Sequence, residues 1–515
     1  MWLKDKLFQK SVIIDALKEH LDKDLNWSKK LLFSEHHLSH AASAFFPSPF
    51  EEAAILTMDG VGEWATTSLA IGRRNKLDVQ KEIHFPHSLG LLYSAITYYI
   101  GFKVNSGEYK VMGLAPYGKP IYIDLIKNHL IDIKEDGSFH LDMSYFNYCT
   151  GLTMTNKKFD KLFGSPPRKP ESKLTQREMD IAASIQAVTE EVVIKLARGI
   201  KKMTGLKNLC LAGGVALNCV ANGKLLKENI FDNIWIQPAS GDAGGALGAA
   251  LAIYYSMLNL PRKVNLSDSM KGAFLGPEYN QKDTERRLKK AGAKFKIVSD
   301  QEVIELTAQA LADGKAVGWH QGRMEFGPRS LGARSIIADS RSPLVQKQLN
   351  LKVKYRESFR PFAPSVLRED LSDWFEIDVD SPYMLLVADI AQNKQLQMTP
   401  EQKKLFGIDK LNVPRSTIPA VTHVDYSARI QTVHKKTNPR YHALISKFKE
   451  ITSFPVLVNT SFNIRGEPIV CTPEDSFNCL MGTDIDFLVV GNCIMRKEDQ
   501  DMSLIKDYRN AYELD

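Results

Sequence analysis

The chain has 515 residues, of which 44% are hydrophobic and 25% charged, as in ordinary globular proteins. This length predicts roughly two to four domains. Its 67 basic and 60 acidic residues give a net charge of +7, too mild to indicate nucleic-acid binding and better suited to local basic pockets for small anions. The chain shows no apolar leader, no membrane-length apolar run and no CxxC pair, so we expect a cytoplasmic protein without a membrane segment or zinc knuckle.

Hydrophobic spacing predicts a charged amphipathic helix over residues 1–30 and a short strand at Leu31–Phe33. A stronger strand follows at Ala53–Met58, and a long amphipathic helix covers residues 174–204. Two further strands, 209–212 and 234–236, each lead through glycines into a helix. Strands that alternate with helices in this way predict an α/β sheet.

A polar, proline-containing stretch at about 260–285 reads as a linker. It predicts two domains, 1–280 and 281–515. The second begins with a helix near 301–313 and continues with strands at 316–319, 454–458 and 487–490, so it too is expected to be α/β.

A metal centre is predicted in the first domain. His36 and His40 are four residues apart, so on a helix they share one face and can bind one ion. Asp59 and Asp242 follow predicted strands, at the edge where open α/β sheets hold ligands. Imidazole together with carboxylate suits iron, zinc or manganese. The alternatives are surface or core histidines, a turn aspartate for Asp59 and a helix N-cap for Asp242.

Glycine-rich turns in the same domain are candidates for nucleotide binding. Glycine lets the backbone approach a phosphate, and a helix N-terminus favours anions. No Walker A sequence is present. Tight helix–strand packing would explain the glycines equally well. Lys110 could instead be an ordinary surface lysine. Together with the aspartates, these turns resemble the actin-like ATPase fold; the nucleotide-binding candidates are Gly60, Lys110, Gly213, Gly214, Asn218 and Gly241.

Arginines and lysines concentrate between residues 322 and 360. Arg323, Arg329 and Arg334 stand among glycines and a proline, and Lys354 and Arg360 follow. Arginine in rigid turns suits bidentate binding of phosphate or of a carbamoyl-like group. The alternatives are a solvated basic face or an RNA patch, but a nucleic-acid face would carry more lysine and aromatic residues.

These motifs together resemble the O-carbamoyltransferase family of nodulation and antibiotic-biosynthesis proteins. Five motifs occur in order between Ser34 and Asn492: the histidine pair, Asp59-Gly60, residues 213–218, residues 322–335 and residues 459–467. The resemblance implies an actin-like first domain, similar to tRNA threonylcarbamoyladenosine transferase, and a second domain similar to YrdC/Sua5.

The resemblance also implies the chemistry. The second domain would bind carbamoyl phosphate and ATP with Mg²⁺ and form carbamoyl-adenylate, at positions matching Arg329, Lys354, Arg360, Arg429, Asn459 and Ser461. The carbamoyl group would then pass to a hydroxyl of a sugar or natural product beside Fe²⁺, or another divalent metal, held by His36, His40, Asp59 and Asp242. No nucleic-acid or membrane partner is implied, and a homodimer stays open.

In one respect the chain departs from the family pattern. Members open with strands that carry a histidine and a lysine near the acceptor and the nucleotide, and here Met1 falls after them. We therefore expect the actin-like domain to lack its first strands. Two alternatives to the carbamoyltransferase remain: a non-catalytic protein that binds nucleotide and carbamoyl phosphate, and a tRNA threonylcarbamoyl transferase.

Overall fold

A five-stranded sheet organises the first half of the computed structural model, which describes residues 7–505. Its strand order is β3-β2-β1-β6-β7. The central strand β1 runs parallel to β6 and antiparallel to β2, so parallel and antiparallel halves meet at β1. The strands are β1 (Glu52–Met58), β2 (Ala65–Arg73), β3 (Lys76–His84), β6 (Asn208–Ala212) and β7 (Asn233–Ile236).

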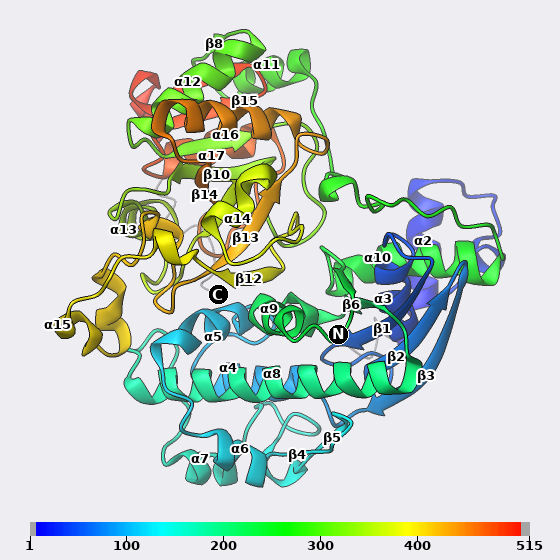
Figure 1. Ribbon diagram of the computed structural model, residues 1–515. Coiled ribbons are helices and arrows are strands. Elements are labelled where there is room, and N and C mark those ends of the chain that lie inside the picture. The colour runs from blue at the N-terminus through cyan, green and yellow to red at the C-terminus, as the bar shows by residue number, and fades with distance from the viewer. Residues whose placement is uncertain (1–6, 506–515) are drawn as a thin grey trace.

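Helices cover both faces of this sheet (Figure 1). The long helix α8 lies on one face, and the pair α3 and α10 lies on the other, because successive side chains of β1 point to opposite sides. A short hairpin, β4 (Ile131–Ile133) and β5 (Phe139–Leu141), stands apart. The helices are α2 (Gln9–His20), α3 (His36–Phe45), α4 (Leu89–Tyr99), α5 (Glu108–Leu114), α6 (Ile123–His129), α7 (Lys157–Phe163), α8 (Gln176–Thr204), α9 (Cys219–Lys227) and α10 (Asp242–Leu251).

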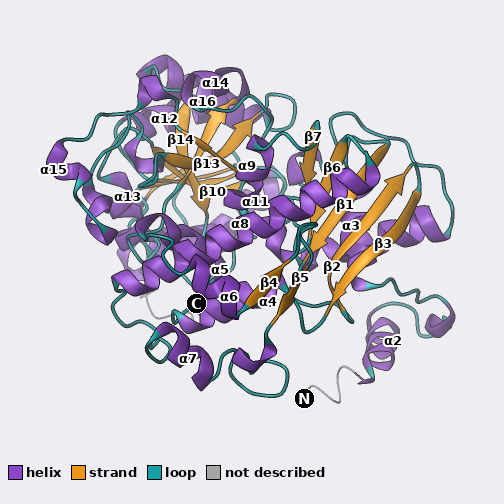
Figure 2. Cartoon of the chain, turned by 60° about the horizontal axis from the view of Figure 1, so that its bottom comes forward, coloured by secondary structure: helices purple, strands orange, loops and turns teal. Residues whose placement is uncertain are grey.

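A nine-stranded mixed sheet organises the second half, in the order β12-β13-β11-β14-β10-β9-β15-β16-β8 (Figure 2). Four of its nine strands are buried along their whole length. The strands are β8 (Lys296–Ile297), β9 (Val317–His320), β10 (Arg334–Asp339), β11 (Ala363–Leu367), β12 (Leu386–Asp389), β13 (Ser427–Val433), β14 (Val456–Ser461), β15 (Phe487–Val490) and β16 (Cys493–Arg496). The helices are α11 (Gln281–Lys290), α12 (Asp300–Ala312), α13 (Val345–Gln348), α14 (Leu371–Trp374), α15 (Pro400–Lys403), α16 (Pro439–Thr452) and α17 (Pro473–Gly482).

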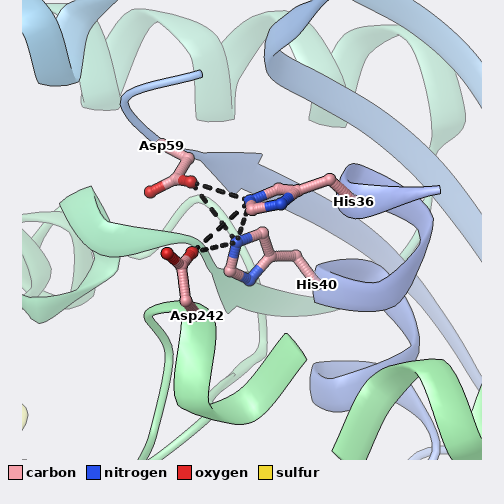
Figure 3. Close-up of side chains that lie close together, drawn as sticks. All are labelled: His36, His40, Asp59 and Asp242. Atoms are coloured by element: carbon pink, nitrogen blue, oxygen red, sulfur yellow. Dashed lines mark hydrogen bonds and ion pairs between the residues drawn. The ribbon is translucent and has the colours of Figure 1, made fainter. Parts of the chain in front are cut away.

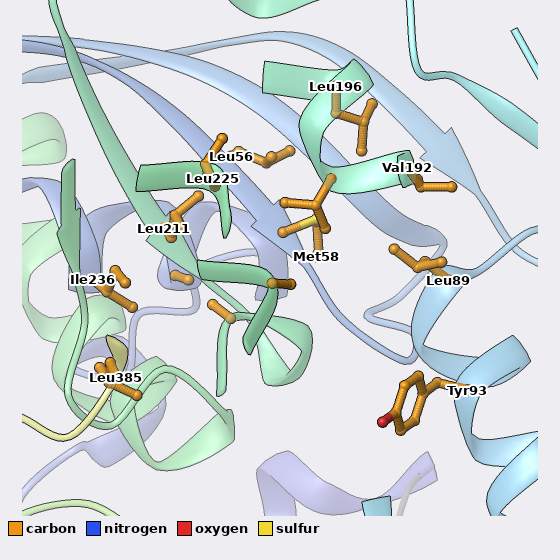
Figure 4. Close-up of a cluster of buried hydrophobic side chains, with 14 of the residues drawn as sticks. Leu56, Met58, Leu89, Tyr93, Val192, Leu196, Leu211, Leu225, Ile236 and Leu385 are labelled. Atoms are coloured by element: carbon orange, nitrogen blue, oxygen red, sulfur yellow. The ribbon is translucent and has the colours of Figure 1, made fainter. Parts of the chain in front are cut away.

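The two halves are joined through α9. The amide of Asn222 donates to the carbonyl of Leu385, just before β12. Leu385 is itself buried in the core of the first half, beside strands β6 and β7 (Figure 4). Burying apolar surface from both halves in one cluster stabilises their contact. The second half is therefore held against the first along α9.

Both sheets confirm the predicted α/β class. They lie on either side of residue 280, since β7 ends at Ile236 and β8 begins at Lys296, although the boundary at 280 itself stays a prediction. The strand predicted at Leu31–Phe33 is wrong: these residues form no strand and pair with none in the described chain, and Phe33 is 61% exposed. The helix predicted over residues 1–30 is confirmed only at Gln9–His20, and residues 1–6 lie outside the described range.

No helix within residues 7–505 combines the length and the apolar composition that a bilayer crossing needs. The longest, α8, has 29 residues but is amphipathic, with one face turned to the core.

Candidate active site: a histidine–aspartate cluster and an arginine-lined cavity

His36 and His40 stand one turn apart on α3, as their spacing predicts (Figure 3). The helix can approach its neighbours closely because residues 41–44 are small. At Gly248 of α10 a Cβ atom would lie 1.8 Å from the Ser39 carbonyl oxygen, so only glycine allows α10 to pack here. The two imidazole Nε2 atoms are 3.0 Å apart. This close packing brings the start of α10 to the histidines.

Asp59 follows the last residue of β1 and faces the same point. The backbone N–H of Gly214 donates to its Oδ1 at 2.9 Å. The other oxygen, Oδ2, lies 3.0 Å from His36 Nε2 and 3.4 Å from His40 Nε2. The loop after β6 therefore fixes the carboxylate so that one oxygen is left for the histidines.

Asp242 completes the cluster as the first residue of α10. The helix cap is Gly241, and no side-chain cap bond is formed, so the N-cap alternative for Asp242 is not realised. Its Oδ1 lies 3.5 Å from His36 Nε2 and 3.7 Å from His40 Nε2. The side chain is 81% exposed, whereas His40 is fully buried. The cluster is thus closed on the His40 side and open beside Asp242.

The four side chains have the geometry of a cation site. One ligand atom from each lies within 4.8 Å of all the others. Two imidazole nitrogens at 3.0 Å repel each other unless a proton or a cation stands between them, and two carboxylates beside them compensate positive charge. Two nitrogens and two oxygens suit a divalent ion such as Fe²⁺, Zn²⁺ or Mn²⁺. The residues therefore fit the predicted metal.

The pKa values of His40 and Asp59 are shifted in opposite directions, and both shifts favour the charged form. Burial alone would lower the pKa of His40, but hydrogen bonds to Asp242 and Asp59 outweigh it and raise the pKa to about 9. Burial opposes ionisation of Asp59, yet the hydrogen bonds from His36 and His40 hold its pKa far below the ordinary range. Without a metal, the cluster retains positive charge as a proton on His40, which indicates a place made for a cation.

The glycine turns lie beside this cluster, and their roles differ. Gly213 has φ +87° and donates its N–H to Ser240, and a Cβ there would lie 2.1 Å from the Met58 carbonyl oxygen. This contact is the tight helix–strand packing that we gave as the alternative explanation for the glycine. Gly241 has open space at the Cβ position, and a Cβ at Gly60 would make only an ordinary contact with Leu91 at 3.9 Å. These two remain free to approach a ligand.

Two other nucleotide candidates are engaged inside the protein. Asn218 caps α9 by accepting from the Ala221 N–H, and its amide exchanges hydrogen bonds with Gln186. Lys110 is 1% exposed, so its surface-lysine alternative is wrong. Its Nζ lies 3.5 Å from Glu357 of the second half. Lys110 is therefore buried beside a residue of the second half.

The second candidate site is a cavity of about 580 Å³ between the two halves. All six residues predicted to bind carbamoyl phosphate and ATP line it. The wall contributed by the first half includes Tyr109 and Met112 of α5 and Cys219 of α9. The six are Arg329, Lys354, Arg360, Arg429, Asn459 and Ser461.

Positive charge in the cavity is only partly compensated. Six lysine and arginine side chains line it against two carboxylates, Asp425 and Glu467. The Nε atoms of Arg329 and Arg429 are buried and have no partner among the described residues. Burial, and then the charge of Arg429, lowers the pKa of Arg329 to about 9. A bound anion would relieve both the desolvation and the repulsion.

Lys354 has a different role from the arginines. Its ammonium donates to the carbonyl oxygens of Ser461 and Asn463, at 2.6 and 2.7 Å, and to both of their side chains. It is 3% exposed. Lys354 therefore holds the turn after β14 in place, and burial, followed by the charge of Arg356, lowers the pKa of its ammonium well below the ordinary value.

The three arginines between residues 322 and 335 lie in different environments. Arg334 is fully buried in β10 and donates to backbone carbonyls, and Arg323 is exposed, so only Arg329 of the three reaches the cavity. Arg356, Arg465 and His423 also line the cavity, although the sequence analysis did not select them as binding residues. Arg356 stands two positions after Lys354, and this proximity was the available signal.

A second cavity of about 1140 Å³, beside α12 and α13, carries basic and acidic side chains in similar number, so its charge favours no anion.

Comparisons with known proteins agree with this pair of sites. The family model described as Carbamoyltransferase N-terminus matches residues 1–251, and Carbamoyltransferase C-terminus matches residues 308–497. The first covers the histidine–aspartate cluster, and the second covers the cavity residues of the second half. The chain belongs to the carbamoyltransferase family, which confirms the resemblance seen in its motifs.

Relatives extend over nearly the whole chain. Uncharacterized protein sll1178 of Synechocystis sp. is 60% identical over all of this chain and 84% of its own length. Nodulation protein NolO of Bradyrhizobium diazoefficiens is 38% identical over 90% of this chain and 78% of its own. Nodulation protein NolNO of Sinorhizobium fredii is 38% identical over 91% and 64%. The crystal structure of T. kodakarensis HypF aligns with 42% of this chain and 35% of its own at 14% identity, with a TM-score of 0.21, too low to define the fold.

Proposed function

We propose that the protein is an ATP-dependent O-carbamoyltransferase that works through carbamoyl-adenylate. The observation that carries the proposal is the interdomain cavity, where all six predicted anion-binding residues meet around incompletely compensated positive charge. Carbamoyl phosphate and ATP are both polyanions, so such a cavity offsets their mutual repulsion. Because the first half supplies part of its wall, a product formed there lies against that half.

The proposed reaction balances as three steps. Water cleaves carbamoyl phosphate to carbamate and phosphate. A carbamate oxygen attacks the α-phosphorus of ATP and displaces pyrophosphate, which leaves carbamoyl-adenylate. The hydroxyl of a sugar or natural product then attacks the carbamoyl carbon, loses its proton, and AMP leaves.

In the cavity the residues bind and orient the substrates. Arg329 and Arg429 can each present donors to phosphate oxygens, as guanidinium geometry favours. Arg360 packs its guanidinium 4.6 Å from the ring centre of Tyr109 and pairs with Glu357, so it is held in place from both halves. ATP would enter with Mg²⁺. Enclosure between the halves would limit access of water to the labile adenylate.

At the histidine–aspartate cluster the residues would hold a divalent metal, with iron as the candidate. Such an ion supplies Lewis-acid polarisation of a carbonyl oxygen when it is bound. Asp59 is oriented by Gly214, and His40 is fixed in the buried side of the cluster. The open side beside Asp242 leaves room for the carbamoyl donor and the acceptor. We also propose that the first half is actin-like and the second YrdC-like, as the family resemblance implies.

The proposal is tested by incubating the purified protein with carbamoyl phosphate, ATP, Mg²⁺, Fe²⁺ and a panel of hydroxyl acceptors. We expect pyrophosphate release that requires carbamoyl phosphate, and AMP with a carbamoylated product when the acceptor fits. Turnover that requires threonine and bicarbonate instead would indicate threonylcarbamoyl transfer. Binding of both substrates without pyrophosphate would contradict the enzyme and favour a binding protein.

A further inference from the structure

The loop between β9 and β10 carries Arg329 from the sheet to the cavity. At its base, the N–H of Gln321 donates to the Ala333 carbonyl at 2.9 Å. The guanidinium of Arg334 donates to the carbonyls of Gln321 and Gly322, both at 3.1 Å. Beyond this base the loop leaves the sheet, and Arg329 lines the cavity. The position of Arg329 therefore depends on what holds the rest of the loop.

Glu325 closes this loop from the inside. Its Oε1 accepts from the backbone N–H of Leu331 at 2.6 Å and from that of Ala333 at 2.8 Å. The N–H of Arg334 donates to the same oxygen at 3.3 Å. Glu325 is buried, which raises the pKa of its carboxyl although these N–H groups oppose the rise. One carboxyl oxygen thus satisfies backbone donors that would otherwise be buried without a partner.

Arg329 lies inside the segment that Glu325 closes, between Glu325 and Leu331. The Nε of Arg329 has no hydrogen-bond partner in the described chain. The tip of the loop is confined as well: Gly327 has φ +127°, and a Cβ there would lie 3.1 Å from the carbonyl oxygen of Pro238 in the first half. The backbone of the loop therefore fixes the point from which the Arg329 side chain reaches into the cavity.

We propose that Glu325 is a positioning residue, which holds the loop in the shape that directs Arg329 at a bound polyanion. This inference rests on the proposed function, in which Arg329 binds phosphate oxygens. Glu325 is not among the residues that line the cavity, so it acts through the place of its acceptor oxygen and not by touching the ligand. A guanidinium binds an anion through the direction of its N–H groups, so a displaced loop lowers the affinity.

Two substitutions separate the geometry of Glu325 from its charge. Glu325→Asp keeps the carboxyl but shortens the side chain by one methylene, which withdraws the acceptor from the N–H groups of Leu331 and Ala333. Glu325→Gln is uncharged but keeps an acceptor oxygen at the same reach. Titration calorimetry with inorganic pyrophosphate should show binding weakened at least about tenfold in Glu325→Asp, the equivalent of one hydrogen bond to a charged group. Glu325→Gln should bind nearly as wild type does.

A double variant distinguishes positioning from a general loss of stability. In an Arg329→Gln background, Glu325→Asp should weaken pyrophosphate binding no further, because the side chain through which it acts is gone. Ser340→Ala is the matched control. The buried Ser340 hydroxyl donates to the Val456 carbonyl at 2.7 Å, and neither residue lines the cavity. This variant should lose stability in urea and keep its affinity.

The wild-type protein supplies a measurement that does not depend on the folding of a variant. Bound pyrophosphate should slow amide hydrogen exchange at Leu331 and Ala333, since an anion held by Arg329 also holds the loop that Glu325 closes.

Four results would overturn the inference and leave the proposed function standing. They are unchanged affinity in a folded Glu325→Asp variant, an equal further loss in the Arg329→Gln background, a larger loss in Glu325→Gln than in Glu325→Asp, and unchanged hydrogen exchange in wild type. Wild type that binds neither pyrophosphate nor carbamoyl phosphate, and releases no pyrophosphate from ATP, would remove both the inference and the proposed function.

Discussion

The histidine–aspartate cluster and the arginine-lined cavity differ in the sign of the charge that a bound ion would have to supply. In the cluster, Asp59 and Asp242 face two histidines, so negative charge is supplied by the protein and a cation is needed to hold the groups together. In the cavity, Arg329 and Arg429 face each other with few carboxylates nearby, so the missing charge is negative. In each site the side chains leave one sign of charge uncompensated, which supports our proposal of a metal in the first half and polyanions between the halves.

The substitution with the largest expected effect should impair the histidine–aspartate cluster and leave the cavity intact. Asp59→Ala removes the ligand that bonds most closely to His36. Carbamoyl transfer should fall by more than about 100-fold, beyond what loss of a supporting hydrogen bond around a metal costs. Carbamoyl-phosphate-dependent pyrophosphate release should persist, because it belongs to the cavity. Metal analysis after dialysis and both assays on one preparation check this, and parallel loss of the two activities in a folded variant would refute the division.

Arg429→Gln should act on the cavity alone. Removing a buried guanidinium that contacts an anion weakens carbamoyl phosphate binding by about 30-fold or more, while metal content stays unchanged. The ligand-free protein should not lose stability, since a like charge beside Arg329 disappears. Arg341→Gln is the matched control: Arg341 pairs with Asp339 at 2.7 Å outside the cavity, so calorimetry should show unchanged affinity. Equal losses in the two variants would show that the cavity arginines have no special role.

Two glycines beside the histidine–aspartate cluster, Gly213 and Gly241, should differ in how much their substitution by alanine destabilises the protein. Gly213→Ala forces a Cβ into the Met58 carbonyl at φ +87° and should lower the free energy of unfolding by about 2 kcal/mol or more. Gly241→Ala, with open space and φ −73°, should cost less than about 1 kcal/mol. Urea denaturation measures both. Similar costs at the two positions would contradict the packing role of Gly213.

Metal affinity should depend on pH through His40. Because its pKa is about 9 in the ligand-free fold and 6.5 ordinarily, its proton stabilises that fold fully below pH 6.5, and this contribution is lost as pH rises through 9. A metal must displace the same proton, so its affinity should rise by up to about tenfold per pH unit across this window and then level off. Metal titrations from pH 6 to 10 show the slope; a flat profile would exclude His40 as the displaced base.

The histidine–aspartate cluster could be predicted from sequence because its signals are local. His36 and His40 share a helix face by spacing, and Asp59 and Asp242 follow strands that lead to one sheet edge. The first-half wall of the cavity could not be predicted, because Tyr109 and Cys219 reach it only through the docking of α5 and α9 on the second half. The burial of Lys110 beside Glu357 could not be predicted for the same reason. The strand at Leu31–Phe33 failed because an apolar run needs a partner strand, which no local pattern supplies.

The most direct test of the division between the sites uses wild-type protein, stripped of metal with a chelator and then reloaded with Fe²⁺. Carbamoyl-phosphate-dependent pyrophosphate release and carbamoylated product are measured on both samples with one acceptor. We predict that the stripped protein still releases pyrophosphate and forms no product, and that Fe²⁺ restores the product. Product formation that is unaffected by stripping, or pyrophosphate release that disappears with the metal, would contradict two separate sites.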